Sequence, residues 1–174
     1  MAAAEITERV ASIDADGHAP AVAVARRGVA VVCERSAEGR AALLYASRLA
    51  ARAGRPLTVL AVSSEERTDI GCGCGRQAAA FRNTMHRELA TEELSEAREV
   101  VAAAHPGVPV AYLLARGGSF IRAVRDAADR HDVDVIVLPA PRTGPLRRIC
   151  SRDRAERLRR RTASTVIVAP PGAA

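Results

Sequence analysis

Five short apolar runs rich in β-branched residues alternate with stretches of helical character, and this alternation constrains the fold more than any other feature. The runs lie at residues 28–33, 56–62, 108–114, 133–139 and 164–170. Continuously apolar runs of this length are typical of strands that are buried on both faces of a sheet. Because helical stretches separate all five runs, the pattern predicts an α/β fold with a doubly wound, five-stranded parallel sheet and helices on both faces.

Local signals indicate where the expected helices lie. We expect helices that follow Ser36, span residues 78–104, open at Gly118-Ser119 and span residues 153–161. Ser36 is a favourable N-cap residue, and Gly54 is typical of a position just after a helix. Polar loops are expected at 63–77 and 139–152. The run at 133–139 is the most apolar of the five, so we place that strand centrally.

The chain has 174 residues, which is enough for one domain and some extra chain. Residues 1–27 are rich in Ala, Asp and Glu without a sustained period, and we expect them to form a flexible N-terminal extension. We expect residues 28–170 to form the domain and residues 171–174 to form a tail. Aromatic residues make up only 2% of the chain, so the core must consist of Val, Leu, Ile and Ala.

Composition excludes several function classes. All 26 basic residues are Arg, which rules out Schiff-base, phosphate-loop and general-base chemistry by Lys. The few aromatic residues argue against stacking platforms for nucleic acid, and no apolar run approaches the roughly 18 residues of a membrane helix. No nucleophile–base set or pair of carboxylates is recognisable, so we expect no catalysis. The N-terminus lacks a secretory layout, and we therefore expect a cytoplasmic protein.

Three segments are similar to the universal stress protein family, and together they cover most of residues 28–170. Residues 31–43, VVCERSAEGRAAL, resemble the family's first strand and turn, with Glu34 in the place of the family's Asp. Residues 118–137 resemble the family's glycine-led helix and its D-L-I-V strand, and residues 156–168 resemble its last helix and strand. The resemblance implies a regulatory or stress-response module that works as a homodimer, with residues 164–170 pairing with their symmetry mates.

Family members that bind ATP use a G-x2-G-x9-G-[ST] loop after the fourth strand, where glycines let the backbone approach the phosphates. The resemblance implies six ligand-lining positions, which are Glu34, Val62, Pro139, Arg142, Arg152 and Asp153. The loop positions carry no glycine here, and Pro139 lacks an N–H donor. We expect Asp153 to be an N-cap paired with Glu156, where its carboxylate would repel phosphate. Ordinary ATP binding is therefore expected to be lost.

Arginines around the same loop leave a different interpretation open. Arg142, Arg147, Arg148 and Arg152 could hold an anion through their side chains, so the chain could bind a nucleotide without the glycines. The longer Arg-rich run at 147–161 is either an anion-binding surface or a solvated helix whose charge is partly compensated. Neither interpretation includes a recognition motif, so we expect no sequence-specific binding of nucleic acid.

Cys72 and Cys74 alternate with glycines in the segment 71–75, and they are the candidate metal ligands of the chain. Cys33 and Cys150 follow strands that should end at the same edge of the sheet, so all four thiols could lie together there. Thiolates suit zinc or another soft metal, and exposed thiols can also act as redox sensors. The spacing matches no established zinc signature, and a free Cys is often an inert core residue. These three interpretations remain open.

Overall fold

The computed structural model describes residues 28–65, 73–141 and 153–170, and it confirms the predicted α/β fold. The strands are β1 (Gly28–Val32), β2 (Leu57–Ser64), β3 (Val110–Gly117), β4 (Val133–Leu138) and β5 (Thr165–Val168). They form one sheet in the order β3-β2-β1-β4-β5, and all four pairings are parallel. Strand β4 lies inside the sheet as expected, but the central position belongs to β1, which pairs with both β2 and β4.

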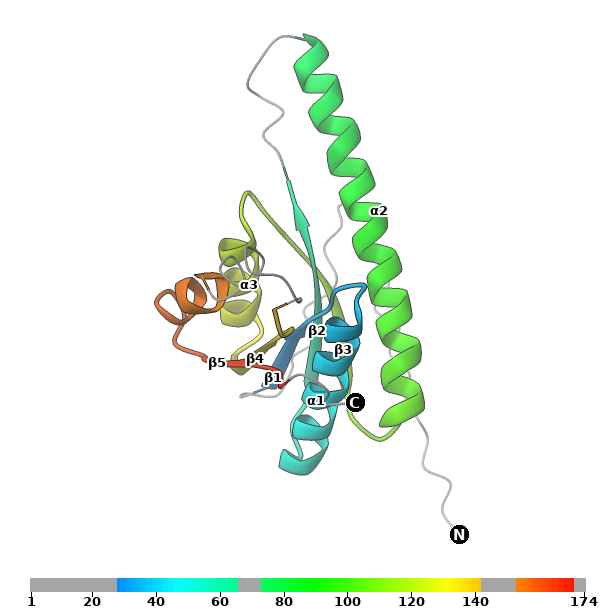
Figure 1. Cartoon of the computed structure of the whole chain (residues 1–174), viewed down its shortest axis with the longest axis vertical. Coiled ribbons are helices and arrows are strands. Elements are labelled where there is room, and N and C mark those ends of the chain that lie inside the picture. The colour runs from blue at the N-terminus through cyan, green and yellow to red at the C-terminus, as the bar shows by residue number, and fades with distance from the viewer. Residues whose placement is uncertain (1–27, 66–72, 142–152, 171–174) are drawn as a thin grey trace.

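Helices cover both faces of the sheet (Figure 1). They are α1 (Ala37–Ala53), α2 (Gly73–Ala104), α3 (Phe120–Arg130) and a short helix at 153–159. Helices α1 and α2 pack on one face, against a core cluster that includes Val29 and Val31 of β1. Helix α3 and the helix at 153–159 pack on the other face, against Ala30 and Val32. Strand β1 is therefore buried on both faces, as its continuous apolar run predicts.

Several predicted boundaries shift. Helix α2 begins at Gly73, so the last five residues of the loop predicted at 63–77 are helical. Glycine costs a helix about 1 kcal/mol, but extending a long helix that already exists is cooperative and offsets that cost. Strand β3 begins two residues later than predicted and ends at Gly117. No helix within the described ranges is long and apolar enough to span a membrane.

The predicted helix caps are present. The Ser36 hydroxyl accepts a hydrogen bond from the backbone N–H of Gly39 at 2.9 Å, and Gly54 adopts the left-handed conformation with φ of 61°. The Ser119 hydroxyl accepts a longer hydrogen bond, of 3.4 Å, from the N–H of Arg122 at the start of α3. These local bonds fix where α1 and α3 leave the carboxyl ends of β1 and β3.

Strand β5 lies at an edge of the sheet, where the sequence predicts pairing with a second copy. The N–H of Ala169 donates to Leu138 of β4, so alternation along the strand turns the backbone groups of Val166 and Val168 toward the open side. The Arg159 side chain donates to the Val166 carbonyl through Nε at 3.3 Å and Nη2 at 3.2 Å. One of the few carbonyls that a partner strand would need is therefore already bonded within the chain.

Candidate functional site

The candidate site lies at the carboxyl ends of β1 and β4. The chain continues from β1 to β2 on one side and later returns with β4 on the other side, so the strand order reverses between β1 and β4. Ligands of open α/β sheets bind at such a switch point. Glu34 follows β1 and Pro139 follows β4, so the topology places both predicted residues at this edge.

Glu34 is held by the tight connection between β1 and α1. Its carbonyl accepts a hydrogen bond of 2.8 Å from the N–H of Ser36. A Cβ atom at Gly39 would lie 2.0 Å from that carbonyl oxygen, so only glycine allows α1 to approach so closely. The Glu34 side chain is about one-third exposed, which leaves its carboxylate accessible from the crevice. A site residue is thus positioned by a glycine five residues later in the chain.

Arg154 reaches across this edge from the helix at 153–159. Its Nη1 lies 4.0 Å from Oε1 of Glu34, and its guanidinium carbon lies 5.2 Å from the centre of the Phe120 ring at the start of α3. A guanidinium over an aromatic face is attracted by the ring's negative face. The side chain therefore links β1, α3 and the last helix around the crevice. The sequence pattern does not distinguish Arg154 from the other arginines of the run at 147–161, although its position two residues after the predicted loop was a usable signal.

Asp153 does not cap the last helix, and that prediction is wrong. Residue 153 is already helical, and its carboxylate accepts hydrogen bonds from Arg157, at 3.0 Å to Nε and 2.7 Å to Nη2. Glu156 likewise pairs with Arg160 at 3.1 Å. Arginines four residues ahead attract both carboxylates through charge-assisted hydrogen bonds. The Arg-rich run is thus largely compensated along residues 153–160, which favours the interpretation as a solvated helix there.

The remaining predicted ligand-lining positions divide into two groups. Val62 is half-buried and packs against the core cluster beneath α3, while Pro139 is half-buried just after β4. Arg142 and Arg152 lie outside the described residues, as do Arg147 and Arg148. The predicted N-terminal extension at 1–27 and the tail at 171–174 lie outside them as well. Of the six positions, the structure brings Glu34 close to the helix that carries Asp153.

The cysteines that are described do not lie together. Cys33 is buried, and its Sγ donates to the carbonyl of Leu60 at 3.4 Å. Burial, reinforced by the nearby Glu93 carboxylate, raises the pKa of the Cys33 thiol from 9.0 to about 12. Cys74 is exposed in the first turn of α2. These properties make Cys33 an inert core residue.

The position of Cys74 on α2 places its thiol far from that of Cys33. Arg35, two residues after Cys33, pairs with Glu92 at 2.8 Å and with Glu96 at 2.6 Å. Cys74 lies eighteen residues before Glu92 in the same helix, which corresponds to about 27 Å along the helix axis. The predicted gathering of four thiols is therefore wrong for Cys33 and Cys74. Cys72 and Cys150 lie outside the described residues, and within those residues no three His, Cys, Asp or Glu side chains form a metal-binding group.

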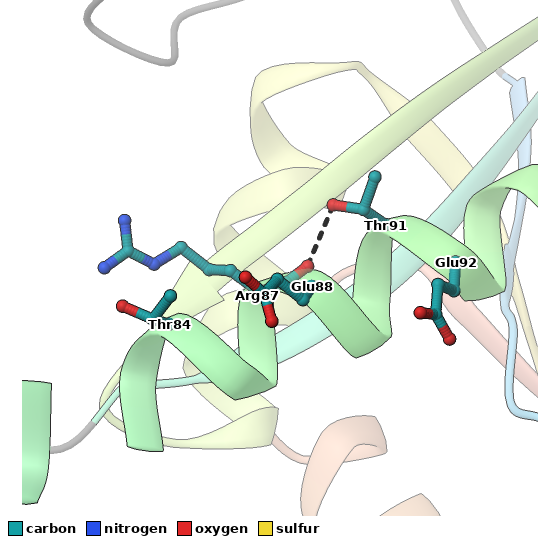
Figure 2. A pocket seen from close by; sticks show the side chains of 5 residues that line it. All are labelled: Thr84, Arg87, Glu88, Thr91 and Glu92. Carbon is teal, nitrogen blue, oxygen red and sulfur yellow. Dashed lines mark hydrogen bonds between the residues drawn. The ribbon is translucent and has the colours of Figure 1, made fainter. Parts of the chain in front are cut away.

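Two surface depressions are lined by other residues than those of the crevice. One, of about 370 Å³, is lined by Thr84, Arg87, Glu88, Thr91 and Glu92, all from α2. Figure 2 shows these side chains spread along one helix, with the Thr91 hydroxyl bonded to the Arg87 carbonyl at 2.8 Å. The other, of about 320 Å³, is lined by Gly118, Ser119, Ile121, Arg122, Arg125 and Arg161. A depression formed by a single helix encloses no ligand. In the second, Asp126 neutralises Arg125 at 2.6 Å.

Solved structures share this architecture. The universal stress protein UspA from Lactobacillus plantarum has a TM-score of 0.68 and 20% identity, over 84% of this chain and 99% of that one. The universal stress protein from Archaeoglobus fulgidus in complex with dAMP has a TM-score of 0.57 and 18% identity, over 83% and 98%. A universal stress protein in complex with cAMP has a TM-score of 0.58 and 17% identity, over 83% and 97%. At these identities, the likeness shows the fold.

The sequence comparison shows the family. No curated protein matches this chain. The sequence pattern of the universal stress protein family matches residues 26–170, which include every described strand and helix. The parallel sheet, its switch point and this match over most of the chain agree, and the chain belongs to the universal stress protein family.

Proposed function

We propose that this chain is a non-enzymatic regulatory or stress-response module that acts through partner proteins and does not bind ATP as the glycine-loop members do. The observation that carries the proposal is the position of Arg154, between the Glu34 carboxylate and the Phe120 ring at the switch point. This side chain occupies space at the edge where a family ligand would lie. The absence of the loop glycines and of an N–H at Pro139 supports the same conclusion.

Calorimetric titration with Mg-ATP tests this proposal. We expect no binding to the wild-type chain. The variant Pro139→Gly/Arg142→Gly/Arg152→Gly/Asp153→Ser restores all four loop positions, and we expect it to bind ATP only after Arg154→Ala is added. Arg157→Ala in place of Arg154→Ala is the matched control, because it removes an arginine of the same helix whose own partner, Asp153, is already replaced. Micromolar binding by the wild-type chain would contradict the proposal.

A second candidate function is nucleotide binding through arginine side chains. The contact between Arg154 and Glu34 spans 4.0 Å, and the Arg154 side chain is more than half exposed, so a phosphate could displace the carboxylate. The bound dAMP and cAMP in two structures of the same fold support this candidate. Titration with dAMP and cAMP distinguishes the two candidates. If arginines hold the phosphate, the wild-type chain binds these nucleotides and Arg154→Ala does not. If arginines do not hold it, neither protein binds them.

A third candidate is a zinc- or thiol-dependent sensor that uses Cys72 and Cys74. The exposure of Cys74 favours it, because an accessible thiol can bind metal or react with an oxidant. Native mass spectrometry of the unreduced protein provides the test. A zinc-sized mass increment that disappears in Cys72→Ser/Cys74→Ser, but persists in Cys150→Ser, would establish the site. The absence of a metal-sized increment from all three proteins, with identical oxidant responses, would exclude it.

A further inference from the structure

Helix α2 carries an apolar stripe that faces away from the sheet. Within the described part of the chain, the large apolar side chains that are exposed are Phe81 at 66%, Met85 at 44% and Leu89 at 47%. Their spacing of four residues places them on one side of the helix. The buried residues of α2 lie on the opposite side: Ala79, Asn83, Ala90, Ala97 and Val101. No contact within the core requires the stripe, which we call the α2 stripe.

Phe81 and Met85 of the α2 stripe lie in the N-terminal half of α2, and Leu89 lies at its midpoint. Figure 1 shows the N-terminal half of α2 rising past the ends of α1 and α3. The large side chains that anchor α2 in the core, Leu94, Val100 and Val101, all lie in its C-terminal half. The stripe therefore lies largely on the part of α2 that projects past α1 and α3, where another helix can approach it.

Charge is segregated along α2 in a way that does not suit an isolated helix. Residues 73–87 contain three arginines, Arg76, Arg82 and Arg87, and no acidic residue, whereas residues 88–104 contain five Glu and one Arg. The first turn lacks an acidic residue and the last turn lacks a basic one. The helix macrodipole favours the reverse distribution. A second α2 helix running antiparallel would place each basic half beside an acidic half, whereas a parallel one would juxtapose like charges.

We propose that the α2 stripe binds the α2 stripe of a second copy of this chain in an antiparallel helix pair. Phe81 of one copy then lies against Leu89 of the other, and Met85 meets its own counterpart at the two-fold axis. A C2 interface must be self-complementary, and both the symmetric stripe and the charge pattern satisfy that requirement. The inference rests on the homodimer that the family resemblance implies, but not on the proposals about nucleotides.

The alternative surface for a second copy is the open edge of β5. There the Val166 carbonyl already accepts two hydrogen bonds from Arg159, which a partner strand would have to displace. The α2 stripe requires no such rearrangement, because its apolar side chains are already exposed and their burial against a partner is favourable. Three side chains form a small interface, so we expect association that depends on concentration, between about 1 µM and about 1 mM.

Disulfide trapping tests the geometry. In a Cys72→Ser/Cys74→Ser/Cys150→Ser background, Met85→Cys places a thiol at the proposed axis. Glu99→Cys is the matched control, because residue 99 is exposed on the same side of α2 but the axis separates its two copies by about 42 Å. We expect a covalent dimer from Met85→Cys and none from Glu99→Cys. Equal trapping of both, trapping of Glu99→Cys alone, or trapping of neither would overturn the proposal.

Charge reversal tests the pairing without relying on one thiol. We expect Arg82→Glu/Arg87→Glu and Glu88→Arg/Glu92→Arg each to weaken self-association at least about tenfold in sedimentation velocity. Arg35 keeps its contact with Glu96 in the second variant. Because α2 becomes largely acidic in the first variant and largely basic in the second, an equimolar mixture should recover the dimer, which also shows that both variants are folded.

The outcomes separate the possible failures. If the wild-type chain is a monomer throughout the concentration range, both the α2 pair and the homodimer expected from the resemblance are wrong. If a dimer forms but neither charge variant weakens it, the second copy binds elsewhere, as at the β5 edge, and the α2 proposal is wrong. Failure of the mixture to recover association also contradicts it. None of these results bears on the nucleotide titrations.

Discussion

Burial decides the chemistry of Cys33. The residue directly follows β1 beneath α1 and α2, and the same environment that hides its sulfur raises the pKa of the thiol to about 12. A thiol reacts as its thiolate, so we expect Cys33 to resist alkylation in the native protein while the exposed Cys74 is modified. Mass spectrometry after a short exposure to N-ethylmaleimide checks this. Rapid modification of Cys33 under native conditions would contradict the packing described.

The same thiol makes stability depend on pH in the alkaline range. Below pH 9.0 the Cys33 thiol is protonated in both the folded and the unfolded chain, so its contribution to stability is fully present. Between pH 9.0 and about 12 the unfolded thiol ionises while the folded one does not, so that contribution is lost as pH rises. Urea unfolding at about pH 8 and about pH 10.5 should therefore show a steeper loss for the wild-type chain than for Cys33→Ala.

A glycine controls the position of Glu34. A Cβ atom at residue 39 would meet the Glu34 carbonyl at 2.0 Å, so Gly39→Ala must push α1 away from the end of β1. We expect a loss of about 1–3 kcal/mol in the free energy of unfolding. Gly107→Ala is the control, because nothing lies within 4 Å of a Cβ at that position. Equal stability of the two variants in urea would show that the β1–α1 connection relaxes freely.

At the scale of elements, the protection of the open β5 edge depends on the Arg159 side chain. Arg159→Ala removes the donors that cover the Val166 carbonyl and leaves that strand edge open. We expect the variant to self-associate more strongly than the wild-type chain in light scattering. Arg157→Ala is the control, because it removes an arginine of the same helix that pairs with Asp153. If both variants scatter alike, Arg159 does not protect the edge.

Local signals account for most elements that could be predicted from the sequence. The continuous apolar runs give all five strands, and Ser36, Gly54 and Ser119 mark helix ends because capping is a local interaction. The start of α2 was not predictable, because cooperativity along a long helix outweighs the two glycines near residue 73. Asp153 was misassigned because a capping box and an i,i+4 ion pair compete for the same carboxylate.

The candidate site was less predictable than the fold. The resemblance located Glu34 at the crevice, but the role of Arg154 depends on where the last helix docks against α3 and β1. That docking is a tertiary contact, made through the buried Ala155 and Leu158, and no periodicity in the chain encodes its direction. The same reason explains the cysteines: their separation follows from the length of α2 and its register on the sheet.

At the scale of the whole molecule, packing is uneven. Strands β1, β2 and β4 lie inside the sheet, while the N-terminal half of α2 is held by few buried residues, Ala79 and Asn83. We expect backbone amides at residues 76–82 to exchange with solvent at least about a hundredfold faster than those of β1, because local opening requires little lost burial. Hydrogen exchange measured by mass spectrometry checks this. Uniform protection at low protein concentration would contradict it, and protection that rises with concentration would agree with helix pairing.

The central position of β1 has a consequence for synthesis on the ribosome. β1 emerges first, yet its neighbour β4 begins at Val133, 105 residues after Gly28. At about 5–20 residues per second, translation leaves one side of β1 without its partner strand for about 5–20 s. During that interval the nascent chain exposes one hydrogen-bonding edge of β1. Slow codons placed before β4 would lengthen that exposure, whereas slow codons placed after β5 would not.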